Sequence, residues 1–173
     1  GYGMAMGQDP EMVRAITAAV KAVVDIPVIP KLTPNTPNIA EIARAAAEGG
    51  ADALCAINTL GPGYTSAHGH PVLSNGAGGM SGKGVLPIAL KCVREVVAAT
   101  GLPVIGCGGA SSAADVRAFF DAGASVVGVG SALVGMTTAD MQAYLHTLQL
   151  DLDHTQDRAE SLVRYDIDMQ FRP

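Results

Sequence analysis

The sequence predicts an α/β fold, in which helices cover a parallel β-sheet. Four short apolar segments alternate along the chain with longer segments whose apolar residues recur at helical spacing. The short segments are continuously apolar, without polar alternation, which is typical of parallel strands buried on both faces. The 173 residues are 49% hydrophobic and only 16% charged, so the chain has ample apolar material for such a core.

The first predicted helix lies in residues 8–25, where Asp9 can cap the first turn and Pro10 fits into it. A short apolar strand is expected over 26–32. The turn-forming sequence TPNTPN then leads into a second helix over 39–50, which ends in glycines. A helix therefore precedes the first strand–helix unit.

The strand–helix unit then recurs three times. The segments EGGADALCAIN and DAGASVVGVGS share a helix-ending glycine, an alanine and the apolar strand that follows, which supports a repeat. Ser112 and Asp115 have the spacing of a capping box and mark the start of one of the helices. A glycine-rich loop is expected between the first of these strands and its helix. The predicted elements are the strands 51–58, 103–109 and 125–133 and the helices 85–100, 112–123 and 137–150.

Four strands leave two architectures open, because a closed (β/α)8 (TIM) barrel needs eight strands and about 250 residues. The chain is either an open four-stranded sheet or the C-terminal half of a barrel, comprising helix 4 and then strands 5–8 with their helices. We assign residues 1–150 to this α/β unit. Residues 151–173 form a tail that mixes charged with apolar residues and is expected to dock on the unit or on a partner.

Charge and cysteine usage argue against several classes of function. The chain has 11 basic and 16 acidic residues, a net charge of −5 and no basic run, which argues against binding to nucleic acid or to an anionic membrane. No apolar stretch reaches the roughly 18 to 20 residues of a membrane span. The three cysteines lack CxxC spacing and lie in apolar contexts, as reduced thiols of a cytoplasmic protein do. Small-molecule chemistry in the cytoplasm is the favoured interpretation.

Candidate functional residues lie at the carboxyl ends of the predicted strands, where α/β proteins place their sites. Lys31 ends the first strand, and a lysine there suggests an anionic or electron-rich group nearby, unless it only reaches solvent. Asn58 and Thr59 end the second strand. The Asn58 amide suits the edge of an amide or imide, unless it only bonds its own loop.

Glycines end the last two strands, as Gly108-Gly109 and as Gly130-Ser131. Glycine at a strand end indicates a close approach of another group to the backbone. The backbone N–H groups after these strands, together with the start of the helix near Ser112, can receive a phosphate. We therefore predict a phosphate site between the two strand ends, the alternative being ordinary turn glycines.

Five segments follow one another along the chain: KLTPN, INTL, PVLSNGAGGMSGKGVLPIALKCV, GCGGASSAADVRAFFDAGAS and VGVGSAL. In order and spacing they resemble the C-terminal half of the class 1 dihydroorotate dehydrogenases, which contain flavin mononucleotide (FMN). They are also similar to the flavin domain of dihydropyrimidine dehydrogenase. The segment AMGQDPE near the start is most similar to that domain and to class 1B enzymes. The resemblance extends to about residue 150.

The resemblance implies an enzyme of pyrimidine biosynthesis that oxidises dihydroorotate to orotate. Hydride passes from C6 of the dihydropyrimidine to N5 of the flavin, and a proton leaves C5. It also implies a site for the dihydropyrimidine at Asn58 and Thr59. For FMN it implies ring and backbone contacts by Lys31, Ile57 and Gly82 and phosphate contacts by Gly108, Gly109, Gly130 and Ser131.

The chain departs from the family pattern in two places, since Pro30 precedes Lys31 in a predicted central strand and Ser131 replaces a common threonine. The family's catalytic base, a cysteine in an N-x-S-C-P segment, would precede Gly1, so no catalytic residue is assigned in this chain. The resemblance therefore implies that the N-terminal half of the barrel is a partner. It further implies a homo-oligomer and, as in class 1B enzymes, an electron-transfer subunit with FAD and an iron–sulfur cluster.

Three alternatives stay open. The substrate could be uracil or thymine in place of dihydroorotate. A non-flavin sugar-phosphate enzyme would need the phosphate glycines but not Asn58 and Thr59, and an inert half-barrel would expose an edge strand and aggregate. His68 and His70 have metal-like spacing, but no carboxylate or cysteine cluster accompanies them, and they are interpreted as surface residues.

Overall fold

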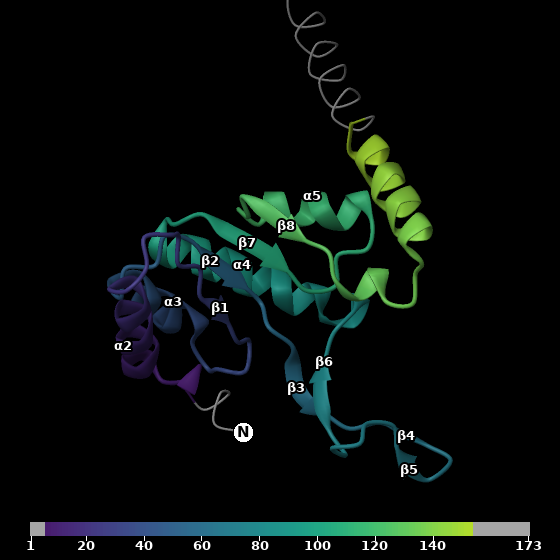
Figure 1. Ribbon diagram of the computed structural model, residues 1–173, viewed down its shortest axis with the longest axis horizontal. Helices are drawn as coiled ribbons and strands as arrows, with labels where there is room; N and C mark the ends of the chain where they lie inside the picture. The colour runs from purple at the N-terminus through teal and green to yellow at the C-terminus, as the bar shows by residue number, and fades with distance from the viewer. Residues whose placement is uncertain (1–5, 154–173) are drawn as a thin grey trace, which may run out of the picture.

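A computed structural model describes residues 6–153 (Figure 1), so the predicted tail 151–173 lies almost entirely outside the described residues. The centre of the molecule is a parallel sheet with the strand order β1-β2-β7-β8. The predicted α/β fold with a parallel sheet is therefore confirmed. The strands are β1 (Lys31–Leu32), β2 (Leu54–Ala56), β7 (Val104–Cys107) and β8 (Val126–Gly128).

The predicted helices are present, and their first turns are capped as the sequence indicates. Asp9 accepts hydrogen bonds from the N–H groups of Glu11 (2.9 Å) and Met12 (3.3 Å), and Ser112 Oγ accepts one from Asp115 N–H (3.3 Å). Such a cap stabilises a helix by about 1 kcal/mol. Within residues 6–153, none of the helices combines the length and hydrophobicity that a membrane span requires. The helices are α2 (Pro10–Lys21), α3 (Ile39–Glu48), the 3-10 turn η1 (Lys83–Val85), α4 (Leu86–Thr100), α5 (Ala113–Asp121) and a last helix over 138–153.

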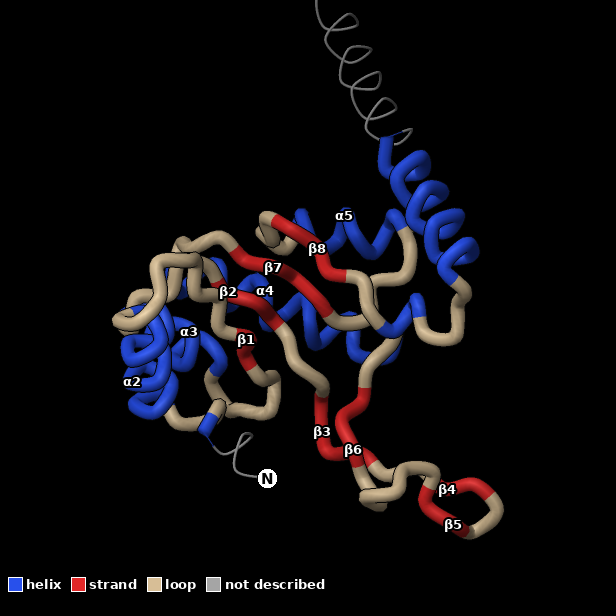
Figure 2. The backbone as a smooth tube through the Cα atoms, viewed as in Figure 1, coloured by secondary structure: helices blue, strands red, loops and turns tan. Residues whose placement is uncertain are grey.

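Helices cover one face of the sheet (Figure 2). Helix α4 packs on β2 and β7, α3 packs on β1, and α5 packs on β8. The main core lies between these layers, where Leu54, Val104 and Phe119 are almost completely buried. Each large apolar side chain buried there contributes about 1.5–3 kcal/mol. Gly106 in β7 makes room for this layer, since a Cβ atom there would lie 2.6 Å from Phe119 Cδ1.

The other face of the sheet has no covering layer among the described residues. Lys31, Cys55, Ile105 and Val126 form one row across it, because they are paired in register. Lys31 is exposed, Cys55 and Ile105 are half-buried, and Val126 is 54% exposed. The prediction that the strands are buried on both faces is therefore wrong for this part of the chain. Continuously apolar strands suit burial on both faces, but a second layer has to supply it.

The strands are also shorter than predicted. Segment 26–32 contributes only two residues to the ladder. Pro30 immediately precedes β1, and its carbonyl oxygen accepts a hydrogen bond from Cys55 N–H (2.9 Å). Proline is tolerated there because β1 is an edge strand of this sheet. The predicted strand 125–133 ends early as well, and Ser131 begins the 3-10 turn η2 (Ser131–Leu133).

The glycine-rich segment after β2 was predicted to be a loop, but it forms an arm that projects from the sheet (Figure 1). The arm consists of two antiparallel pairs of short strands. Glycine and proline within them hide the apolar alternation that indicates a strand. His68 and His70 are exposed in the arm, and residues 6–153 contain no group of three or more His, Cys, Asp or Glu side chains placed to hold a metal ion. The pairs are β3 (Leu60–Gly63) with β6 (Gly78–Met80) and β4 (Ser66–Ala67) with β5 (His70–Pro71).

Candidate functional site

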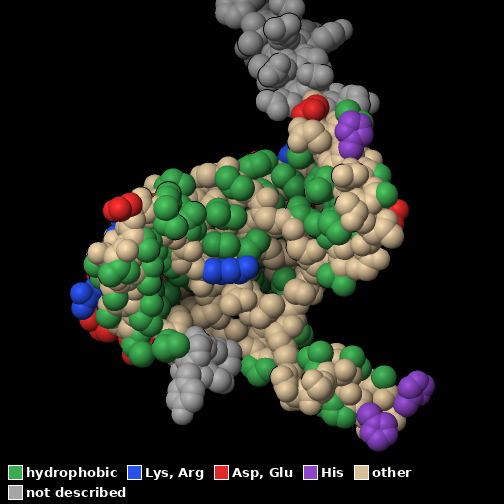
Figure 3. All heavy atoms as spheres, in the orientation of Figure 1, with side chains coloured by type: hydrophobic (Ala, Val, Ile, Leu, Met, Phe, Trp, Pro, Cys, Tyr) green, Lys and Arg blue, Asp and Glu red, His purple; other side chains and the backbone are tan. Residues whose placement is uncertain are grey.

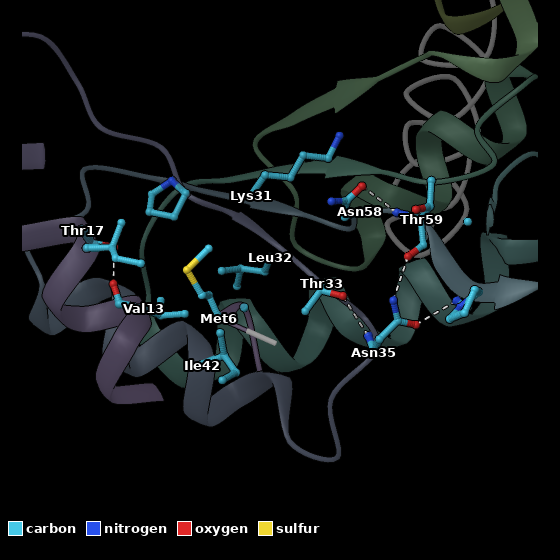
Figure 4. Close-up of a pocket in the computed structure, with 16 residues that line it drawn as sticks. Met6, Val13, Thr17, Lys31, Leu32, Thr33, Asn35, Ile42, Asn58 and Thr59 are labelled. Atoms are coloured by element: carbon cyan, nitrogen blue, oxygen red, sulfur yellow. Dashed lines mark hydrogen bonds between the residues drawn. The ribbon is translucent and has the colours of Figure 1, made fainter. Parts of the chain in front are cut away.

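Two adjoining cavities lie at the carboxyl ends of the parallel strands. The larger has a volume of about 470 Å³ (Figure 4) and is lined by residues of α2, of the segment after β1 and of the base of the arm. The smaller, of about 160 Å³, is lined by residues that follow β2, β7 and β8. Lys31, Asn58 and Thr59 line both cavities. Figure 3 shows the hollow between the body of the molecule and the arm, on the side of the uncovered sheet face.

The smaller cavity brings together residues that are far apart in the sequence. Eight of the nine residues predicted for the FMN and pyrimidine sites line it. Gly82 is the one that does not line it. A Cβ atom on Gly82 would lie 3.9 Å from Ser131 Oγ, so this glycine is beside the cavity. The eight are Lys31, Ile57, Asn58, Thr59, Gly108, Gly109, Gly130 and Ser131.

The glycines after β7 are required by the protein's own packing. Gly109 has a φ of +83°, and a Cβ atom there would lie 2.6 Å from Gly82 O and 3.0 Å from Leu86 N. Gly108 has a φ of +129°, and a Cβ atom there would lie 2.9 Å from Ala89 Cβ. The close approach that glycine indicates at this strand end is therefore made by η1 and the first turns of α4.

Gly130, after β8, is in a different situation. A Cβ atom on Gly130 would meet no described atom within 4 Å, and its φ of −129° lies outside the left-handed region. Packing of the described residues therefore gives no reason for a glycine here. Because Gly130 lines the smaller cavity, the space beside its backbone is open to a ligand.

Asp115 occupies the start of α5, near Ser112, where a phosphate was predicted. Its Oδ2 accepts hydrogen bonds from the N–H (3.0 Å) and the hydroxyl (3.2 Å) of Ser111, and its Oδ1 pairs with Lys83 Nζ. Its own N–H donates to Ser112 Oγ. The side chains of Asp115 and Ser112 occupy these donors, so fewer N–H groups at the helix start are left for an anion. The helix start is thus a poorer place for a phosphate than the sequence predicts, and the loops after β7 and β8 remain.

The network around Asp115 predicts an acid-sensitive contribution to stability. Burial raises the pKa of Asp115, but hydrogen bonds from Lys83, Ser111 and Ser112 outweigh it and hold the pKa at about 2. Because this pKa is below that of an unfolded aspartate, the carboxylate stabilises the fold above about pH 4, and the contribution is lost as the pH falls through about 2. We expect Asp115→Asn to lower the free energy of unfolding at pH 7 by about 2 kcal/mol. Urea denaturation at a series of pH values measures this.

The matched control is Asp121→Asn, at the exposed C-terminal end of the same helix. This carboxylate lies at the negative end of the helix dipole, so its removal should not lower stability. The deficit of Asp115→Asn should shrink between about pH 4 and pH 2. A deficit that stays constant over this range, or an equal one in the control, would contradict the role given to the Asp115 carboxylate.

Asn35 positions the Asn58-Thr59 segment, although no sequence pattern indicated it as a site residue. Its Nδ2 donates to Thr59 O (3.1 Å), and its Oδ1 accepts from Gly61 N–H (2.9 Å), so its amide bridges this segment (Figure 4). Asn58 Oδ1 accepts from Thr59 N–H (2.8 Å), which is the bond within its own loop that was the alternative for this residue. Asn35 belongs to the segment KLTPN, but the sequence does not say which loop its side chain reaches.

Comparisons with known proteins agree on one family. The chain matches the family model for dihydroorotate dehydrogenase over residues 1–146. It is 52% identical over 134 residues to dihydroorotate dehydrogenase B (NAD(+)), catalytic subunit, of Methanocella arvoryzae. It is 49% identical over 138 residues to dihydroorotate dehydrogenase A (fumarate) of Lactiplantibacillus plantarum. These alignments cover 77% and 79% of this chain but 44% and 45% of those proteins, so the chain spans less than half the length of the curated relatives it matches.

The fold also has a counterpart among solved structures. The crystal structure of DHODH from Eimeria tenella, in complex with ferulenol, matches with a TM-score of 0.60 at 21% sequence identity. The match covers 85% of this chain and 49% of that one. At this level of identity the likeness concerns the fold alone.

Proposed function

Because the chain belongs to the dihydroorotate dehydrogenase family, as its five sequence segments indicated, we propose that it contributes FMN- and pyrimidine-binding residues to an enzyme that oxidises dihydroorotate to orotate. The observation that carries the proposal is the smaller cavity, where Lys31 of β1 and residues at the ends of β2, β7 and β8 line one space. With the adjoining cavity of about 470 Å³, the space falls in the usual range of about 300–1,000 Å³ for small-molecule sites.

The residues around the smaller cavity suit FMN. Gly130 leaves open space beside its backbone, and the Ser131 hydroxyl can donate a further hydrogen bond, as a phosphate requires. Lys31 lines both cavities, so its ammonium group can stabilise negative charge on an electron-rich ring placed between them. When bound, the flavin supplies the redox chemistry by accepting a hydride, and the protein supplies binding and orientation.

Asn58 and Thr59 are the residues that we propose for the pyrimidine. Their position at the boundary of the two cavities would hold a pyrimidine next to a ring beside Lys31. The Asn58 amide can pair with the imide edge of a pyrimidine, because it carries both donors and an acceptor. The hydrogen bond that Asn35 donates to Thr59 O, with the one that it accepts from Gly61 N–H, would keep this segment in place while the substrate exchanges.

We propose that the four strands are strands 5–8 of a (β/α)8 barrel and that an N-terminal half supplies the first four. Strands β1 and β8 are the edges of the sheet, and one of its faces lacks a covering layer in the described chain. Helix α2 exposes Met12, Ile16 and Val20 in one stripe, each 42–46% accessible, and apolar stripes of this kind mark contact surfaces. The N-terminal half would bury these surfaces and bring the catalytic base that the family resemblance implies.

The assignment of residues 1–150 to the barrel and of 151–173 to a docking tail belongs to the same proposal. So do a homo-oligomer and a separate electron-transfer subunit with FAD and an iron–sulfur cluster. The electron-transfer subunit is supported by the name of the class B relatives, which describes them as catalytic subunits.

A comparison of FMN with riboflavin tests the proposal. The two ligands differ only in the phosphate, so we expect FMN to bind the 173-residue chain at least about tenfold more tightly, because the phosphate gains charge-assisted hydrogen bonds. Quenching of flavin fluorescence measures both affinities. Equal affinities would mean that the strand-end glycines hold no phosphate, and absence of binding even with the N-terminal half present would favour the sugar-phosphate enzyme or the inert half-barrel. With the N-terminal half present, anaerobic bleaching by dihydroorotate against dihydrouracil identifies the substrate.

A further inference from the structure

Two cysteines are in contact on the uncovered face of the sheet. Cys55 in β2 and Cys107 in β7 have their Sγ atoms 3.6 Å apart. Cys107 lies two residues after Ile105, the register partner of Cys55, so both side chains are on the same face. The Cys107 Sγ is also 3.2 Å from Ile57 O, to which the thiol donates when it is protonated.

Lys31 gives this pair of thiols a positive neighbour. It is the register partner of Cys55 and lines the same cavity as Cys107. The Cys55 thiol and the Lys31 cation lower the pKa of Cys107 to about 6, against the opposing effect of burial. The contact with Cys107, together with burial, raises the pKa of Cys55. When the pair loses one proton, these surroundings favour the negative charge on Cys107, to which the Cys55 thiol can donate a hydrogen bond.

Cys107 also borders a cavity, in contrast to the third cysteine. It lines the smaller cavity at the carboxyl end of β7, where the candidate site opens. Cys92 in α4 is only 5% exposed within the main core, and burial raises its pKa. Because the thiolate is the nucleophilic form of cysteine, we expect Cys107 to be reactive and Cys92 to be inert.

We propose that Cys107 is a site of covalent modification by small α,β-unsaturated carbonyl compounds, with Cys55 as its hydrogen-bond donor and Lys31 as its counter-ion. The Cys107 Sγ adds to the β-carbon of the alkene and forms an S–C bond. The π electrons of the alkene move to the α-carbon, which takes a proton from water, so the step needs no oxidant or reductant. The adduct then occupies the cavity proposed for FMN, so modification and flavin binding exclude each other. Only this exclusion rests on the proposed function.

Labelling of the full 173-residue chain with N-ethylmaleimide at pH 6.5 tests the proposal, with peptide mapping by mass spectrometry to give the rate at each cysteine. At this pH a thiol of lowered pKa is mostly ionised, but its intrinsic nucleophilicity is also lower. The two effects together predict that Cys107 reacts about four to eight times faster in the folded chain than in urea. Cys92 should react more slowly in the folded chain than in urea.

Variants identify the origin of the reactivity. Cys55→Ala should move the pH midpoint of Cys107 labelling upward by about one unit or more, since the hydrogen-bond donor is lost. Lys31→Gln should move it in the same direction, and it provides the test if Cys55→Ala does not fold. Cys92→Ala is the matched control and should leave the midpoint unchanged. A midpoint near that of an ordinary thiol in the parent chain, or one that neither variant moves, would overturn the proposal.

Flavin separates this proposal from the function proposed above. Prior addition of FMN should slow the labelling of Cys107 but not that of Cys92. Fast labelling that FMN does not slow would support the modification site and contradict the flavin site in this cavity. Slow labelling in a chain that binds FMN would contradict the modification site alone.

Discussion

Replacement of Gly130 by aspartate is expected to weaken FMN binding about 100-fold while leaving the stability of the chain nearly unchanged. Gly130 lines the smaller cavity, and a Cβ atom there would meet no described atom within 4 Å, so the fold has room for a side chain. The new carboxylate would stand in the space proposed for the phosphate, and two anions in a partly buried site repel each other strongly. Flavin fluorescence titration gives the affinity, and urea denaturation gives the stability.

The matched control for this variant is Gly84→Asp. A Cβ atom on Gly84, in η1, likewise meets no described atom within 4 Å, but this glycine lines neither cavity. The control adds the same charge near Gly82, so the difference in affinity isolates the effect of placing the charge in the cavity. Equal affinities for the two variants would mean that no phosphate is held at the end of β8. A large loss of stability for Gly130→Asp alone would mean that the protein itself needs this space.

Helix starts and strand–helix order could be predicted because the interactions that determine them are local. Asp9 and Ser112 cap their helices through N–H groups two or three residues away, so the sequence contains both partners of each bond. The order of apolar strands and amphipathic helices likewise required a parallel sheet, which the pairing of β1, β2, β7 and β8 confirms. Convergence of the candidate residues followed from the sheet, since parallel strands end at the same edge.

Other features depend on partners that are distant in the sequence, and no pattern could indicate them. Asn35 bonds Thr59 and Gly61, which are 24 and 26 residues away. The carboxylate of Asp115 pairs with Lys83, 32 residues earlier, and this pair occupies the helix start where a phosphate was predicted. The uncovered sheet face is the clearest case, because apolar strands predict burial without saying which segment provides it.

A glycine at a strand end can leave room for a ligand or for the protein's own backbone, and the sequence could not separate the two. Gly109→Ala tests the second explanation. We expect this substitution to lower the free energy of unfolding by about 3 kcal/mol. Gly109 has a φ of +83°, which strains any side-chain-bearing residue, and its new Cβ atom would lie 2.6 Å from Gly82 O. Backbone atoms cannot rotate away as a side chain can, so η1 and the start of α4 would have to shift. Urea denaturation measures the loss.

Gly135→Ala separates the two costs of that substitution. Gly135 has nearly the same φ, +82°, but a Cβ atom there would meet no described atom within 4 Å. Gly135→Ala therefore has only the cost of the backbone conformation, about 1–2 kcal/mol, and the remainder of the Gly109→Ala deficit measures the close approach. If the two variants lose equal stability, the loop after β7 does not press against Gly82 in solution. The positive φ of Gly109 would then be the physical reason for a glycine there.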